Sequence, residues 1–245
     1  MNYIRKKNIL MIHGWGGNSF SDWELNGWNE FLDSINLNPI YVDILGHGKS
    51  NHPLDPSKYN DLAGDILNQI SEIDTPYAIG FSLGSKLLLE IAFRESNRFE
   101  KIIISGLGNN VFQSEKLADE VANLLDKTDG FTSKKIVKDL ADYAVSNGNN
   151  PLSLSACLRR KPNPILTPEK IKKIHSNILI ICGDKDEVAY PFNNLKENLL
   201  QSKSYIIRNI NHLDLPGDNE LKAMVKIFLT DSEFNISKGG LHELY

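Results

Sequence analysis

The fold of this chain is decided by the stretch Tyr77-Ala78-Ile79-Gly80-Phe81-Ser82-Leu83-Gly84. It joins an apolar run typical of a buried strand to the pattern Gly-x-Ser-x-Gly, and residues 85–94 continue with helical spacing. A serine at such a strand-to-helix turn takes a strained conformation that exposes its hydroxyl, and the glycines remove side chains where the two elements cross. The helix N-terminus also favours negative charge there. We therefore predict Ser82 as a nucleophile; the alternative is a glycine-rich turn in which Ser82 only caps the helix.

Short apolar runs alternate with amphipathic helical patterns on both sides of this stretch. Most of the runs are continuously apolar, as expected for parallel strands that are buried on both faces. A strand–helix–strand order favours right-handed crossovers and a sheet covered by helices. The sequence therefore predicts an α/β fold with a mostly parallel central sheet and helices on both faces. The predicted strands are residues 9–12, 40–42, 77–81, 101–105, 178–182 and 204–208.

The alternation of strands and helices is interrupted once, after Ser105. The residues that follow have helical patterns and then a cluster of prolines, without a convincing strand. We interpret this segment, residues 108–175, as a helical cap inserted into a core of residues 1–107 and 176–230; ordinary surface helices are the alternative. Residues 231–245 are polar and are predicted to be a tail outside the fold.

Composition excludes several classes of protein. The 245 residues include 27 Lys and Arg against 31 Asp and Glu, a formal net charge of −4, so no nucleic acid partner is expected. No stretch approaches the roughly 18 apolar residues of a membrane span, so no membrane partner is expected.

Cys157 and Cys182 lie far apart and form no disulfide framework, which indicates reduced thiols and a cytoplasmic location. The scattered histidines give no metal motif, and neither a metal nor a cofactor is predicted. The sequence does not indicate the oligomeric state.

A second glycine-rich motif, His13-Gly14-Trp15-Gly16-Gly17, follows the first strand. Glycines at this point let the backbone approach a substrate oxygen, and we predict an oxyanion hole made by the amides of Trp15 and Leu83. A phosphate-binding loop is the alternative, but the motif lacks the lysine and the Ser/Thr that such a loop needs. Trp15, Phe81 and Phe112 are predicted to line an apolar substrate pocket.

Four motifs follow one another along the chain: His13-Gly14-Trp15-Gly16, Asp43-Ile44-Leu45-Gly46-His47-Gly48-Lys49-Ser50, Gly80-Phe81-Ser82-Leu83-Gly84 and Gly183-Asp184-Lys185-Asp186. In this order they make the chain resemble the α/β-hydrolase superfamily from about His13 to Leu229. The family resembled most includes small carboxylesterases with a helical cap, such as the pimeloyl-carrier-protein methyl ester esterases. In that superfamily the Asp-x-x-Gly-x-Gly-x-Ser segment is a structural loop, which implies structural roles for His47 and Ser50.

The resemblance also implies partners for the serine, in the chain order serine, acid, histidine. The last aspartate of the fourth motif, Asp186, takes the position of the acid, with Asp184 as the second choice. His212 follows the final predicted strand and takes the position of the base. The preceding Asn211 replaces a glycine that is common in the family, and asparagine tolerates a left-handed backbone. The other candidate histidines are His52, His175 and His242.

These residues predict a serine hydrolase that cleaves an ester or thioester of a small or medium acyl group through an acyl-enzyme. The substrate is expected to be a small molecule, with a carrier-linked acyl group as a further option. A C–C bond hydrolase, a lactonase or a cofactor-independent lyase would use the same three residues. A ligand-binding receptor on the same fold is the alternative from a different class.

Overall fold

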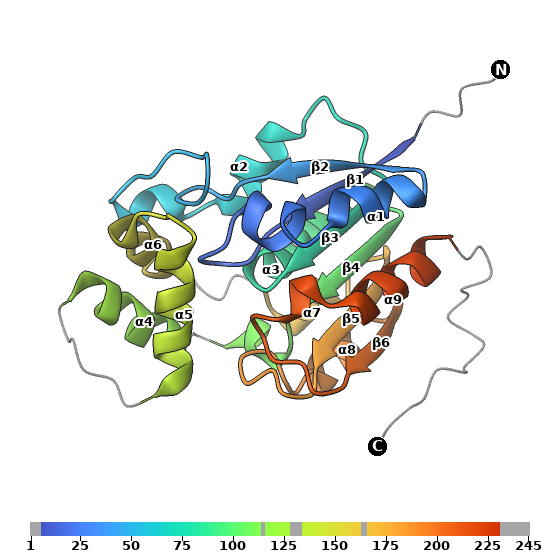
Figure 1. Ribbon diagram of the computed structural model, residues 1–245. Coiled ribbons are helices and arrows are strands. Elements are labelled where there is room, and N and C mark those ends of the chain that lie inside the picture. The colour runs from blue at the N-terminus through green and yellow to red at the C-terminus, as the bar shows by residue number, and fades with distance from the viewer. Residues whose placement is uncertain (1–5, 114–115, 128–133, 163–165, 231–245) are drawn as a thin grey trace.

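The structure is a computed structural model that describes residues 6–113, 116–127, 134–162 and 166–230. Within these residues, six strands form one sheet in the order β2-β1-β3-β4-β5-β6 (Figure 1). Every neighbouring pair is parallel, which confirms the predicted fold class. The strands are β1 (Lys7–Ile12), β2 (Leu37–Val42), β3 (Tyr77–Phe81), β4 (Lys101–Ser105), β5 (Asn177–Gly183) and β6 (Ser202–Ile207).

Both faces of the sheet are covered by helices (Figure 1). Leu10 and Ile12 of β1 pack in a cluster with helices on one face of the sheet, whereas Ile9 and Met11 pack in a second cluster with helices on the other face. All four side chains are fully buried, because successive side chains of a strand point to opposite faces. Burial on both faces explains the continuous apolar runs of the sequence.

The helix that follows the motif around Ser82 has 12 residues, and the last described helix of the chain has the same length. The helices are α1 (Trp28–Ser34), α2 (Leu62–Gln69), α3 (Leu83–Arg94), α4 (Lys116–Asp126), α5 (Lys135–Ser146), α6 (Pro151–Leu158), α7 (Pro168–Ile171), α8 (Asn193–Asn198) and α9 (Asn219–Thr230), with short turns η1 (Phe20–Glu24), η2 (Pro56–Tyr59), η3 (Asn109–Phe112) and η4 (Leu215–Gly217).

Helices α4, α5 and α6 form a separate layer at one end of the sheet, at the left in Figure 1. Their apolar side chains make a cluster of their own, which also packs against Trp15, Val188 and Leu213 of the core. We call α4, α5, α6 and the described residues between them the cap. The described elements at the two ends of residues 108–175 also pack on the core. The turn η3 packs against α8, and α7 packs against α3 and α8, because Ile171 belongs to the core cluster.

The strand order places two loops on the two sides of a crevice. From β1 the chain crosses to β2 at the edge and then returns to β3 on the other side of β1. The loops after β1 and β3 therefore diverge at the carboxyl ends of adjacent strands, which is where open α/β sheets bind ligands. His13-Gly14-Trp15 follows β1 and Ser82 follows β3, so the topology brings both motifs to this crevice.

Among the helices of the described residues, none is both long and apolar enough to pass through a membrane.

Candidate active site

Ser82 joins β3 to α3 in a conformation that L-residues rarely adopt, with φ 50° and ψ −111°. Neighbouring backbone leaves no space for side chains at the flanking glycines. A Cβ at Gly80 would lie 2.5 Å from the amide nitrogen of Ser85, and a Cβ at Gly84 would lie 2.2 Å from the carbonyl oxygen of Ile12. The strained turn and the role of its glycines agree with what the motif predicts.

Three predicted side chains meet at the carboxyl edge of the sheet. His212 Nε2 lies 3.0 Å from Ser82 Oγ, and His212 Nδ1 lies 2.9 and 2.8 Å from the two carboxylate oxygens of Asp186. His212 is buried, and its ring stacks at a tilt on that of Phe81 with centroids 4.9 Å apart. In this geometry Nδ1–H donates to Asp186 and Nε2 is left to accept the hydroxyl proton of Ser82.

The backbone holds Asp186 in place and directs Asp184 elsewhere. Asp186 is 1% exposed, and one of its carboxylate oxygens also accepts the N–H groups of Val188 and Ala189 at 3.0 and 2.8 Å. Asp184 instead accepts the N–H of Asn209 at 2.6 Å. The structure therefore places the first-choice aspartate, and not the second, beside the histidine.

The two predicted oxyanion donors face the same cavity. Leu83 is the first residue of α3, so its N–H has no acceptor within the helix. Trp15 is the second residue of a tight turn closed by a hydrogen bond from Gly17 N–H to Gly14 C=O, and Gly16 has φ 81°. The N–H of the second residue takes no part in such a turn and points outward. Both residues line the cavity beside Ser82.

A buried carboxylate supports this turn, and the sequence analysis missed it. Asp22 of η1 accepts the N–H of Gly14 at 2.8 Å, and it also accepts the hydroxyl groups of Ser21 and of Tyr143, which comes from α5. Burial raises the pKa of the Asp22 carboxyl, and the neighbouring His13 imidazole and the hydrogen bonds from the three donors act against that rise. The cap thus contacts the turn that carries Trp15 through a polar group as well as through apolar packing.

A second polar contact joins the cap to the same turn. Asn149, in the loop between α5 and α6, donates to Gly16 C=O at 2.8 Å and accepts from Gly48 N–H at 2.9 Å. The Trp15 indole N–H donates to Leu154 C=O of α6 at 3.3 Å. No sequence motif signals these contacts, because they depend on where the cap lies.

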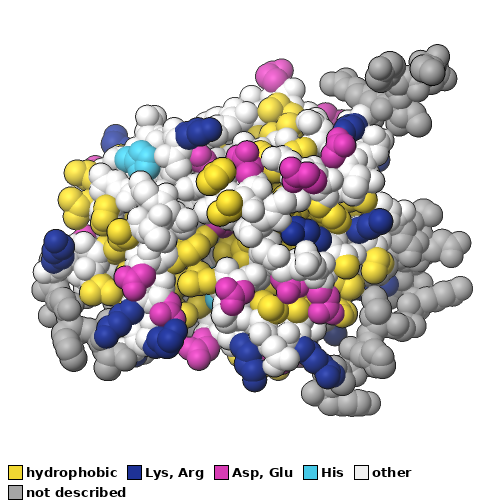
Figure 2. Space-filling model, viewed as in Figure 1, with side chains coloured by type: hydrophobic (Ala, Val, Ile, Leu, Met, Phe, Trp, Pro, Cys, Tyr) yellow, Lys and Arg dark blue, Asp and Glu magenta, His cyan; other side chains and the backbone are white. Residues whose placement is uncertain are grey.

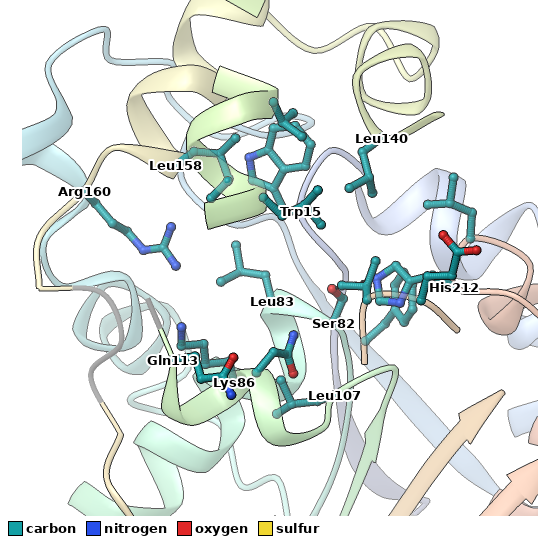
Figure 3. Close-up of a pocket in the computed structure, with 18 residues that line it drawn as sticks. Trp15, Ser82, Leu83, Lys86, Leu107, Gln113, Leu140, Leu158, Arg160 and His212 are labelled. Carbon is teal, nitrogen blue, oxygen red and sulfur yellow. Dashed lines mark hydrogen bonds between the residues drawn. The ribbon is translucent and has the colours of Figure 1, made fainter. Parts of the chain in front are cut away.

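The cavity between core and cap has a volume of about 530 Å³ (Figure 3). On the face shown in Figure 2, hydrophobic side chains are visible between the cap at the left and the core, and acidic and basic side chains are interspersed around them. The walls are mainly apolar, with Ser82 and His212 on one side and the cations Lys86 and Arg160 elsewhere in the lining. The lining residues are Trp15, Phe81, Ser82, Leu83, Lys86, Leu107, Asn110, Gln113, Leu117, Ala118, Val121, Leu140, Leu158, Arg160, Glu187, Val188, His212 and Leu213.

Comparison with known proteins identifies the family of this chain. Residues 7–157 match the family model described as alpha/beta hydrolase fold. The chain belongs to the α/β-hydrolase family. It is 30% identical over 212 residues to a pimeloyl-[acyl-carrier protein] methyl ester esterase of Nitrosospira multiformis, covering 75% of this chain and 78% of that protein. It is 25% identical over 227 residues to a putative 2-succinyl-6-hydroxy-2,4-cyclohexadiene-1-carboxylate synthase of Bacillus subtilis, covering 79% of each.

The fold also matches solved structures. MenH from S. aureus superposes with a TM-score of 0.74 at 18% identity, over 93% of this chain and 95% of that one. At this identity the superposition supports the α/β-hydrolase fold alone.

Two other histidines of this α/β-hydrolase chain serve the structure. His13 Nε2 accepts the N–H of Ile44 at 3.0 Å, so its Nδ1–H donates to Gly14 C=O at 2.7 Å. His47 is fully buried, and burial lowers its pKa to about 3. His52 contacts Gly48 C=O. Neither these residues nor the exposed His175 reaches Ser82, and His242 lies outside the described residues.

The structure places Phe112 outside the lining of the cavity. Its ring packs against the core cluster, whereas Asn110 and Gln113 of the same segment reach the cavity. The reason is the turn η3, which docks on α8 and rotates Phe112 toward the core. Trp15 and Phe81, the other two predicted pocket residues, do line the cavity.

Sequence analysis also missed the two cations in the cavity wall. Lys86 lies one helical turn after Ser82 on α3, a spacing that could have been read from the sequence. Arg160 follows α6, and nothing in its local sequence indicates that it faces the site.

Proposed function

We propose that this hydrolase cleaves a carboxylic ester or thioester of a small or medium acyl group through an acyl-enzyme on Ser82. The observation that carries the proposal is the 3.0 Å contact between Ser82 Oγ and His212 Nε2, with Asp186 bound to the opposite ring nitrogen. Such an arrangement activates a hydroxyl that is otherwise a weak nucleophile. The similarity to the esterase of Nitrosospira multiformis supports the choice of an ester.

Each residue has a role in the proposed reaction. Ser82 Oγ attacks the carbonyl carbon as its proton passes to His212 Nε2, and Asp186 stabilises the imidazolium. The amides of Trp15 and Leu83 donate to the oxyanion. His212 then gives its proton to the departing alkoxide or thiolate, which leaves an ester on Ser82. A water molecule then gives a proton to His212 and attacks the carbonyl carbon of that ester. His212 returns the proton to Ser82 Oγ as the bond to the acyl group breaks and the carboxylic acid leaves.

The first test is covalent labelling. A fluorophosphonate is expected to add once, on Ser82, and Ser82→Ala is expected to lose labelling and to lower ester turnover by a factor of about 10⁶. Ser71→Ala, at an exposed position, is the matched control and is expected to keep both. Labelling of folded Ser82→Ala on another serine would overturn the assignment.

Carbon–carbon bond cleavage or elimination on the same residues is the second candidate. The similarity to the Bacillus subtilis synthase, over 79% of both chains, favours it. An acyl-enzyme distinguishes the two, because an elimination that uses Ser82 only to move a proton forms none. Mass spectrometry of enzyme quenched during turnover of an activated ester is expected to show an acyl group added to Ser82. Turnover without any such adduct would favour the second candidate.

A further inference from the structure

The cavity wall contains a buried arginine whose charge is not balanced by the part of the chain that the structure describes. Arg160 is 4% exposed, and one of its terminal nitrogens donates to Cys157 C=O at 2.6 Å. Among the described residues, no carboxylate lies within ion-pair distance of its guanidinium. A guanidinium has five donors and keeps its charge at any working pH, and a buried charge without a counter-charge is costly.

The guanidinium is directed into the cavity from the side opposite the proposed nucleophile. In Figure 3, Arg160 points inward from the cap side, and Ser82 and His212 lie across the cavity from it. Leu83 and Leu158 are among the apolar side chains that border the space between them. A ligand that reaches from Ser82 to Arg160 thus needs an apolar middle and an anionic end.

The acidic side chain in the described lining lies on a different segment from Arg160. Glu187 follows Asp186 directly, so it belongs to the loop that carries the proposed acid rather than to the segment of Arg160. Lys86, 5% exposed, is the other basic residue of the lining and comes from α3. Arg160 follows α6, so its guanidinium is the group that we consider as the partner of an anionic ligand.

We propose that Arg160 binds a carboxylate of the substrate, so that the enzyme prefers half-esters of dicarboxylic acids over neutral esters. This inference rests on the proposed ester hydrolysis. The planar fork of a guanidinium pairs with both oxygens of a carboxylate, and the pairing is strong where water is excluded. The apolar walls accommodate the methylene chain between the carboxylate and the ester carbonyl, which lies at Ser82.

The test compares two esters of one acid. The specificity constant kcat/KM is measured by titration of released acid for the monomethyl and dimethyl esters of a series of diacids from succinate to sebacate. Wild type is expected to prefer the monomethyl ester at the chain length that fits. Arg160→Met, which keeps an unbranched apolar stem and removes the guanidinium with its charge, is expected to lose about 100-fold on that ester, mainly through KM.

Two controls separate binding from structure. Arg160→Met is expected to lose much less on the dimethyl ester than on the monomethyl ester, because the carboxylate contact is absent there. Arg160→Lys is expected to recover part of the loss, since a lysine supplies the charge without the fork. Equal losses on both esters, or a wild type without any preference for the monomethyl ester, would overturn the inference.

A binding measurement distinguishes this inference from the proposed function. Calorimetry with the free diacids requires no turnover, and wild type is expected to bind the preferred diacid at least tenfold more tightly than Arg160→Met. If neither ester is hydrolysed but this difference is found, ester hydrolysis is wrong and the carboxylate site stands. If esters are hydrolysed and no Arg160-dependent binding or preference is found, the carboxylate site is wrong.

Discussion

At the level of single residues, two aspartates in the loop after β5 differ in their partners although they are two positions apart. Asp186 accepts a hydrogen bond from His212 Nδ1 and is buried, whereas Asp184 accepts the N–H of Asn209. The geometry therefore separates two candidates that have the same chemistry, and the separation can be tested with matched substitutions.

Asp186→Asn is expected to lower kcat for ester hydrolysis by about 10⁴, because an amide at this position favours the wrong tautomer of the histidine. The measurement is steady-state kinetics on an activated acetate ester, with circular dichroism to verify folding. Asp184→Asn is the control and is expected to stay within about tenfold of wild type. A larger loss in the Asp184 variant than in the Asp186 variant would reverse the assignment.

At the level of elements, the cap does more than cover the cavity, because it holds the turn that carries the Trp15 amide. Asn149 donates to Gly16 C=O and Tyr143 donates to Asp22, which in turn accepts from Gly14. Both contacts come from the cap, from α5 and from the loop that follows it. Oxyanion stabilisation depends on donors being placed beforehand, so these cap residues are expected to influence the rate without touching the substrate.

Asn149→Ala is expected to lower kcat by about tenfold and to leave KM within about twofold, because a displaced oxyanion donor weakens transition-state binding. The neighbouring Asn150→Ala is the control: Asn150 caps α6 by accepting from Leu152 and Ser153 N–H, so its loss is expected to lower stability by about 1 kcal/mol without lowering kcat. The measurements are steady-state kinetics, the rate of fluorophosphonate labelling and urea unfolding. If Asn149→Ala keeps the kcat of wild type, as Asn150→Ala is expected to, Asn149 acts only on stability.

For the molecule as a whole, stability is expected to depend on pH through His47. Burial lowers the pKa of this side chain to about 3 in the folded state, whereas an unfolded chain binds the proton below about 6.5. The folded pKa is the lower one, so the unfolded state gains protons first and stability falls as pH falls below about 6.5. Between pH 7 and pH 5 the loss from this group is about 2 kcal/mol, from 1.36 kcal/mol per pH unit.

The substitution His47→Gln is expected to reduce the fall in the free energy of unfolding between pH 7 and pH 5 by about 2 kcal/mol. The measurement is urea unfolding followed by tryptophan fluorescence at several pH values. His175→Gln, at an exposed position, serves as the control and is expected to keep the slope of wild type. An unchanged slope in the His47 variant would mean that its imidazole takes up no proton on unfolding in this range.

Much of the fold and part of the candidate site follow from local patterns. The continuous apolar runs predicted the strands, because a strand that is covered on both faces cannot alternate with polar residues. The motif around Ser82 predicted a strained turn, because only glycine fits where α3 crosses the backbone of β1. The chain order of serine, acid and histidine named Ser82, Asp186 and His212, and the structure brings these three together; their catalytic roles stay predictions.

The remaining features were decided by contacts between distant segments. The ring of Phe112 turns toward the core because η3 docks on α8, although an apolar residue near the start of the insert was an equally good candidate for the cavity. Arg160 faces the cavity, and Asn149 holds Gly16, only because the cap lies over the carboxyl ends of the strands. Local sequence determines whether a segment is a strand, a helix or a sharp turn, since backbone conformation depends on neighbouring residues. The direction in which a side chain points depends on which surface its element packs against, and that surface is formed only when segments that are far apart in the sequence come together.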